Sequence, residues 1–250
     1  MTRIKWLNEF PYFIIGLMIF FFLATHSPNL EYDTPSYINF GVIRPPLYPL
    51  FISLFRWAAP HQFSLIIWTH GVLLFAAILY ARYWLKKNFQ IPDLFIFITF
   101  LFTLLTISFH FQLTYVQSEG ITFPLFIVTF FLLIECFYQF SFKKISCLSL
   151  LVSLLVLARL QFFYLYAIFI LLCLWYAWKK IPIKSILAAT VILFSSMGLT
   201  TLIDHGYHYV KHGFFGAAPY SGLMVLVQTL YLADNNAASY FNDSNVKKLV

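Results

Sequence analysis

Residues 145–178 read ISCLSLLVSLLVLARLQFFYLYAIFILLCLWYAW, an apolar run of 34 residues that only Arg159 and Gln161 interrupt. As one helix the run would be about 51 Å long, whereas the hydrocarbon core of a bilayer is about 30 Å thick. A single helix would also put the lysine pairs 143–144 and 179–180 on opposite sides of a membrane. The run therefore predicts a tight hairpin that turns at Arg159, with this charge at membrane depth.

The composition of the whole chain is also typical of a membrane protein. Of the 250 residues 61% are hydrophobic and 10% are charged, and the mean hydropathy is +0.82. A soluble core of this size does not need so much apolar surface. We therefore expect an all-α fold, a polytopic transmembrane helical bundle of about seven spans. The expected spans are 10–25, 63–85, 93–113, 120–139, 145–158, 161–178 and 184–203.

A shorter apolar stretch, Leu47–Ala59, contains Pro49 and Arg56. It is too short to span a bilayer, so we expect an amphipathic helix that lies along the periplasmic or lumenal interface. The N-terminal apolar run Phe10–Ala24 follows Arg3 and Lys5. We expect it to be an uncleaved anchor, because the sequence Ala-Thr-His-Ser at its end is a poor cleavage site for signal peptidase.

The positions of the basic residues indicate topology. The net charge is +7, but the lysines and arginines cluster at the ends of apolar runs, which argues against a nucleic-acid partner. With a cytoplasmic N-terminus, ten of the sixteen basic residues share the cytoplasmic side, as the positive-inside rule requires. The ten are Arg3, Lys5, Arg82, Lys86, Lys87, Lys143, Lys144, Lys179, Lys180 and Lys184.

Two regions of different character are expected. Residues 1–203 form the transmembrane module, with an outer loop at 26–62. Residues 204–250 form an outer-side polar segment, in which glycines break helices and a short helix is expected near Tyr220–Leu232. The three cysteines, Cys136, Cys147 and Cys173, lack metal-ligand spacing and are expected to be small buried apolar residues.

The densest polar cluster is Glu31-Tyr-Asp33-Thr-Pro-Ser-Tyr37, followed by Arg44-Pro-Pro-Leu-Tyr48. The Asp33 carboxylate could accept a proton from a hydroxyl nucleophile or hold a divalent metal; alternatively, it is a solvated loop acid or a helix N-cap. The prolines stiffen the backbone after Arg44, which suits bidentate binding of a phosphate, or of lipid headgroups.

Two further charges fall on the same predicted outer side. Glu119 opens the fourth span, where an acid would also be favoured simply as part of a helix N-terminus. Arg159 at the hairpin turn needs a partner at membrane depth, and Asp33, Glu119 or a substrate phosphate could supply one; alternatively, its long side chain snorkels to the headgroups.

Histidines give a weaker pattern. His205, His208 and His212 have i, i+3, i+7 spacing, which would align them for zinc on a helix; the alternative is a set of neutral interface histidines. His70 and His110 lie inside expected spans and suit interhelical hydrogen bonds.

The order of these motifs resembles the membrane-embedded C-type glycosyltransferase superfamily, in particular its protein O-mannosyltransferase and lipid A aminoarabinose transferase branch. The resemblance rests on Asp-x-x-Ser-Tyr, Arg-Pro-Pro-Leu-Tyr-Pro-Leu-Phe, Ser118-Glu119 and Ala158-Arg159, within about residues 5–203. It implies transfer of a sugar from a polyprenyl phosphate carrier to a lipid, glycan or protein acceptor at the extracytoplasmic face.

On this resemblance Asp33 is the catalytic base and Glu119 a second catalytic acid. Arg44 and Arg159 are phosphate binders, and Tyr37 and Tyr48 are further candidate substrate-binding residues in the same motifs. No cofactor is required by the pattern, although a divalent metal would be compatible with it. The expected location is a bacterial inner membrane, since the outer loops lack sequons apart from Asn242-Asp-Ser.

Two features depart from the family pattern. Tyr32 separates acids that are often adjacent, and family members continue through more spans or an outer domain, so a truncated, non-catalytic paralogue is one alternative. A transporter or flippase for lipid-linked or small polar molecules is another. Such proteins place polar residues near mid-membrane and often contain repeated halves, which this sequence does not show.

Overall fold

The computed structural model describes residues 2–106 and 113–219, with side chains from residue 9 onward. These residues form helices and their connections, with one isolated bridge between Asn29 and Tyr115. The elements are α1 (Thr2–Thr25), α2 (Thr34–Ile38), α3 (Leu47–Ser53), η1 (Arg56–Ala58), α4 (Gln62–Phe89), α5 (Asp93–Leu105), α7 (Glu119–Tyr138), α8 (Phe142–Ala158), η2 (Leu160–Tyr164), α9 (Leu165–Trp178) and α10 (Ile183–His212). The all-α expectation is confirmed.

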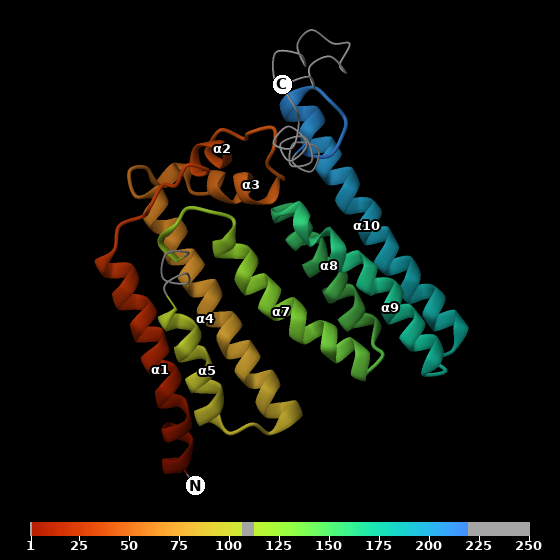
Figure 1. Ribbon diagram of the computed structural model, residues 1–250, viewed down its shortest axis with the longest axis horizontal. Helices are drawn as coiled ribbons and strands as arrows, with labels where there is room; N and C mark the ends of the chain where they lie inside the picture. The colour runs from red at the N-terminus through yellow and green to blue at the C-terminus, as the bar shows by residue number, and fades with distance from the viewer. Residues whose placement is uncertain (1, 107–112, 220–250) are drawn as a thin grey trace, which may run out of the picture.

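Helices α1, α4, α7, α8, α9 and α10 run back and forth between the same two ends of the molecule, and the shorter α5 begins at the end that carries the N-terminus and stops part-way along the bundle (Figure 1). We call one the site end; it carries α2, α3, the segment before α7 and the turn after α8. The other, the basic end, carries the N-terminus and the α4–α5, α7–α8 and α9–α10 connections, where the lysine-rich segments lie.

Four of the helical segments are long and apolar enough to cross a membrane: Gln62–Phe89, Glu119–Tyr138, Leu160–Trp178 and Ile183–His212. The expected count of seven is not supported by this criterion. In the described part of the chain α5 stops after 13 residues, because Thr106 takes an extended backbone, and α8 has only 17 residues. The four spans are compatible with an integral membrane protein.

The hairpin expected at Arg159 is confirmed. Helix α8 ends at Ala158, and Arg159 is extended, with φ −152° and ψ 118°. The chain then reverses through η2 into α9, so that both lysine pairs lie at the basic end (Figure 1). Helix α10 extends beyond the expected end of the seventh span at residue 203, because it continues through Gly206 to His212 and ends at Gly213, whose φ is 78°. The helix expected near Tyr220–Leu232 lies outside the described residues.

The interfacial helix expected at Leu47–Ala59 is two short pieces, α3 and η1. Pro49 lies in the first turn of α3, where its missing N–H removes no helical hydrogen bond. Tyr48 and Ile52 are fully buried, so α3 packs down onto the bundle rather than lying freely on a lipid surface.

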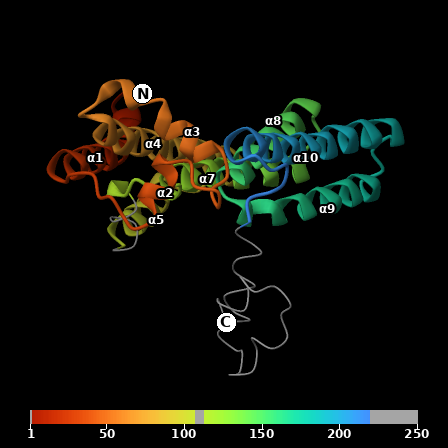
Figure 2. The same ribbon diagram turned by 90° about the horizontal axis from the view of Figure 1, so that it is seen from above.

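Two apolar clusters hold the helices together. One joins α1, α4, α5, α2 and α3, and the other joins α8, α9 and α10. Helix α7 belongs to both, since Ile121 near its start packs in the first cluster and Leu132 packs in the second. Figure 2 shows the two groups side by side with α7 between them. The site end is therefore assembled where the two groups meet.

The outer surface of the helices is apolar. Phe102, Leu174 and Val191 expose 73%, 61% and 64% of their surface, as lipid-facing side chains would. The expectation of buried cysteines holds for Cys136, but Cys147 is exposed on α8. A hydrocarbon environment would tolerate such a small apolar residue at the surface.

Candidate functional site

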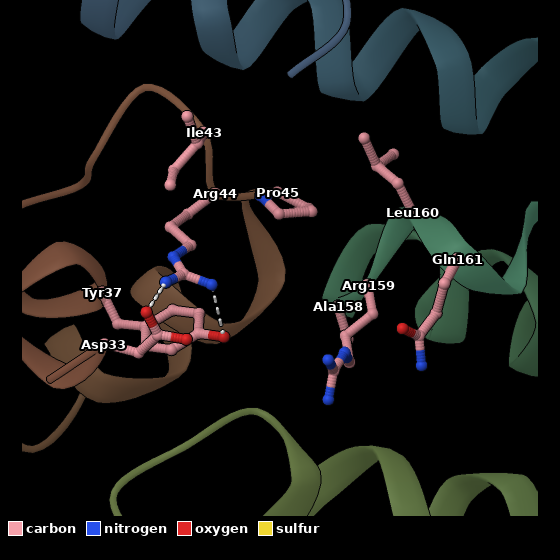
Figure 3. A pocket seen from close by; sticks show the side chains of 9 residues that line it. All are labelled: Asp33, Tyr37, Ile43, Arg44, Pro45, Ala158, Arg159, Leu160 and Gln161. Atoms are coloured by element: carbon pink, nitrogen blue, oxygen red, sulfur yellow. Dashed lines mark hydrogen bonds and ion pairs between the residues drawn. The ribbon is translucent and has the colours of Figure 1, made fainter. Parts of the chain in front are cut away.

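Four charges that are far apart in the sequence gather at the site end. Asp33 immediately precedes α2, Arg44 lies in the turn before α3, Glu119 is the first residue of α7, and Arg159 joins α8 to η2. Asp33, Arg44 and Arg159 line a cavity of about 70 Å³, and Glu119 does not. Its walls are formed by Asp33, Tyr37, Ile43, Arg44, Pro45, Ala158, Arg159, Leu160 and Gln161 (Figure 3).

Local hydrogen bonds fix the segment Glu31–Tyr37, which we call the acidic loop. Pro35 lies in the first turn of α2, and Asp33 occupies the N-cap position, but its carboxylate makes no capping hydrogen bond. The Ser36 hydroxyl instead donates to the Asp33 carbonyl at 2.6 Å. The Asp33 side chain is therefore free to point away from the helix, and 51% of it is exposed.

Each nitrogen of the Arg44 guanidinium has a polar partner. Its Nε donates to Ser36 Oγ at 2.7 Å, one terminal nitrogen donates to the Tyr37 hydroxyl at 3.1 Å, and the other pairs with Asp33 Oδ1 at 2.6 Å. The guanidinium also lies 4.3 Å from the centre of the Tyr37 ring. With all three nitrogens occupied and only 9% of the residue exposed, Arg44 is suited to orient Asp33 rather than to capture a phosphate. The sequence interpretation of Arg44 as a phosphate binder is not favoured by this geometry.

Tyr37 links the acidic loop to α7. Its ring is buried, and this burial raises the pKa of the phenol above its ordinary value. The neutral hydroxyl accepts from Arg44 and lies 3.1 Å from Ser118 Oγ, which in turn is 3.4 Å from Glu119 Oε2. A continuous polar chain therefore joins the two acids.

Arg159 pairs with Glu119, and both side chains remain about a quarter exposed. Among the described residues it makes no second side-chain hydrogen bond. Its guanidinium lines the cavity beside Gln161 and on the opposite wall from Arg44 (Figure 3). Arg159 can therefore bind an anion without breaking the hydrogen bonds that Arg44 makes within the acidic loop.

Tyr48 does not line the cavity, contrary to its expected role in substrate binding. It is fully buried and packs edge-on against the Tyr37 ring, with centroids 4.9 Å apart. Desolvation holds the pKa of its phenol well above the ordinary value. Its oxygen lies 3.5 Å from Nε2 of the buried His70, so Tyr48 supports the site from beneath.

The segment before α7 holds the acidic loop in place. The Asn29 amide donates to the Thr114 carbonyl at 2.8 Å, and the Val116 amide donates back to Asn29 at 3.1 Å. The Thr34 hydroxyl, fully buried, donates to the Val116 carbonyl at 3.2 Å. Sequence reasoning missed Thr34 as a connector, because nothing local in a hydroxyl residue identifies a partner 82 positions away.

The three histidines of α10 do not form a metal site. The ring nitrogens of His208 face the backbone carbonyl oxygens of Asp204 and Val42, which accept at 2.8 and 3.1 Å, and His205 packs edge-on against Phe215. Within residues 2–106 and 113–219, no three potential ligands are close enough together to hold a metal ion. His208 instead ties α10 to the loop that carries Arg44, and His110 lies outside the described residues.

Comparison with protein-family models, curated proteins and solved structures gives no match to this chain.

Proposed function

We propose that this protein is an integral membrane glycosyltransferase that moves a sugar from a polyprenyl phosphate carrier to an acceptor at the extracytoplasmic face. The observation that carries the proposal is the cavity with the half-exposed Asp33 carboxylate on one wall and the Arg159 cation on the other. A proton acceptor opposite an anion binder is what displacement of a phosphate by a hydroxyl requires.

Asp33 is assigned as the base. Arg44 engages Oδ1, so Oδ2 is left to take the proton of an acceptor hydroxyl. The hydroxyl oxygen then bonds to the anomeric carbon as the bond from that carbon to the carrier phosphate breaks. The phosphate leaves with the electron pair, and Asp33 holds the proton, so charge and atoms balance.

Arg159 is assigned to the carrier phosphate. Its guanidinium would stabilise the negative charge that develops on the leaving group, at the depth where a polyprenyl chain meets water. Glu119 competes for the same cation in the free protein, so we infer that it keeps Arg159 in position until the phosphate arrives. The acceptor class, whether lipid, glycan or protein, is left open by these contacts.

The seven-span topology belongs to the same proposal. Helices α1 and α8 run between the same two ends as the four long apolar segments, and α5 runs part of the way (Figure 1). The proposal counts these three helices as further crossings. The basic end would then face the cytoplasm, and the site end would face the periplasm of a bacterial inner membrane.

Transfer of radiolabelled sugar from polyprenyl phosphate in membranes tests the assignment of Asp33. Asp33→Asn keeps the side-chain shape but cannot take a proton, so transfer should fall at least about a hundredfold. Glu31→Gln is the matched control, because Glu31 is an acid of the same loop that does not line the cavity, and it should retain transfer. Undiminished transfer by Asp33→Asn would remove Asp33 from the mechanism.

A further inference from the structure

A second and larger cavity lies behind the turn that carries Arg159. It occupies about 250 Å³ between the end of α8, η2 and α10. Its walls are formed by Val156, Leu157, Leu160, Phe163, Thr200, Thr201, Asp204, His205 and Ala217. Leu160 is the one described residue that it shares with the cavity around Asp33. The two cavities are therefore neighbours with different walls.

The two threonine hydroxyls in this second cavity already donate their protons to backbone carbonyl oxygens. Thr200 Oγ1 donates to the Ser196 carbonyl at 2.7 Å and accepts from the Tyr166 hydroxyl at 2.9 Å. Thr201 Oγ1 donates to the Met197 carbonyl at 3.1 Å. A hydroxyl has one proton and two lone pairs, so Thr201 can offer a ligand only an acceptor.

Asp204 adds a carboxylate to this acceptor surface. The residue is only 4% exposed; the backbone N–H of Ala218 donates to the carboxylate, but Oδ1 makes no hydrogen bond, and His208 Nδ1 lies 3.6 Å from it. A buried carboxylate with an incomplete set of partners is costly, and a ligand that brings donors and positive charge would offset this cost. An anionic ligand would be repelled.

We propose that this cavity binds a small primary amine, with its ammonium group at Asp204 and Thr201 and its apolar part against Leu157 and Phe163. An ammonium carries three donors and no acceptor, which complements a wall of acceptors. The Phe163 ring adds an aromatic face for the cation or for the apolar body of the ligand.

The volume sets the size of the amine. An engineered apolar cavity of about 150 Å³ holds benzene, so this cavity accommodates a single ring with a short aminomethyl arm. Such binding does not depend on the transferase activity proposed above, because it uses neither Asp33 nor Arg159.

A series of matched probes tests the proposal: 4-fluorobenzylamine, 4-fluorobenzyl alcohol and 4-fluorobenzoate. Binding is followed by fluorine NMR line broadening with the full-length protein in phosphatidylcholine nanodiscs at neutral pH, and empty nanodiscs are subtracted. The amine should bind saturably and at least tenfold more tightly than the alcohol, whereas benzoate should not bind. Asp204→Asn should abolish the tenfold preference for the amine.

Two further variants complete the test. Ala217 is an exposed residue of the cavity wall, and Ala217→Phe should reduce binding of the amine and the alcohol alike, because the ring takes up space in the cavity. Asp33→Asn in the other cavity should leave amine binding unchanged. If the amine binds equally to the wild type and to Ala217→Phe, or if benzoate binds as well as the amine, the proposal is overturned. A protein that binds the amine but transfers no sugar would contradict only the proposed function.

Discussion

At the basic end one arginine pairs with two carboxylates. At the site end two arginines, on opposite walls of a cavity, pair with one carboxylate each. Arg82 donates to Asp93 at 2.8 Å and to Glu9 at 3.0 Å, and it lies 4.0 Å from the centre of the Tyr12 ring. Lys86 completes the cluster by pairing with Asp93.

The difference between the two ends distinguishes a structural ion-pair cluster from a candidate binding site. The Arg82 cluster ties α1, α4 and α5 together and leaves Arg82 only 7% exposed, so no ligand can enter it. At the site end half of the Asp33 side chain is exposed, and Arg159 has a single carboxylate partner among the described residues. An incomplete cluster beside a cavity is where a substrate can complete the set.

The largest effect is expected at the basic end. Arg82→Met should lower the free energy of unfolding by about 3–5 kcal/mol, because it breaks the Arg82–Asp93 pair, whose side chains are only 9% and 10% exposed; the 65% exposed Glu9 adds little to this loss. Thermal unfolding in nanodiscs measures this loss. Lys86→Met is the control, since the Lys86 side chain is more exposed than Arg82 and Asp93 keeps its other partner; it should cost much less. Equal destabilisation by both variants would refute the central role of Arg82.

The two arginines of the site end should separate in kinetic assays. Arg159→Lys should weaken binding of polyprenyl phosphate by about 10- to 100-fold, because one charge-assisted hydrogen bond is worth about 1.5–3 kcal/mol. Arg44→Lys should leave this binding nearly unchanged and instead lower the transfer rate, because Asp33 loses its orientation. The reverse pattern would assign the phosphate to Arg44.

Packing beneath the site offers a third test. A Cβ at Gly120 would lie 2.1 Å from Nδ1 of His70, so Gly120→Ala should push α7 from α4 and lower stability by about 1–3 kcal/mol. Gly206→Ala is the matched control, because nothing lies within 4 Å of its Cβ, and it should stabilise the helix by about 0.5–1 kcal/mol. Combining Gly120→Ala with His70→Ala should recover part of the loss, and failure to do so would locate the clash elsewhere.

The smallest effect concerns competition for Arg159. Glu119→Gln removes the resident negative partner, so inorganic phosphate should bind about two- to fivefold more tightly, a gain below about 1 kcal/mol. Isothermal titration calorimetry at low salt measures it, with Glu31→Gln as the control. Weaker phosphate binding would mean that Glu119 helps to hold the anion.

Local patterns predicted the parts of the fold that depend on one segment at a time. The break at Arg159 follows from length, because an unbroken helix would overshoot a bilayer. The continuation of α10 past residue 203 could not be predicted in this way. Gly206 weakens a helix only by its propensity, and packing of Asp204 and His208 against the rest of the protein overrides this cost.

The sequence by itself determined the helical class, the apolar surface and the separation of basic residues from the acidic loop, since these follow from composition and short-range spacing. Only the tertiary structure decided which charge meets which. Pairing Arg44 with Asp33 and Arg159 with Glu119 depends on where α2, α7 and the α8–η2 turn come to rest. Contacts between distant segments are set by packing of whole helices, so no local pattern encodes them.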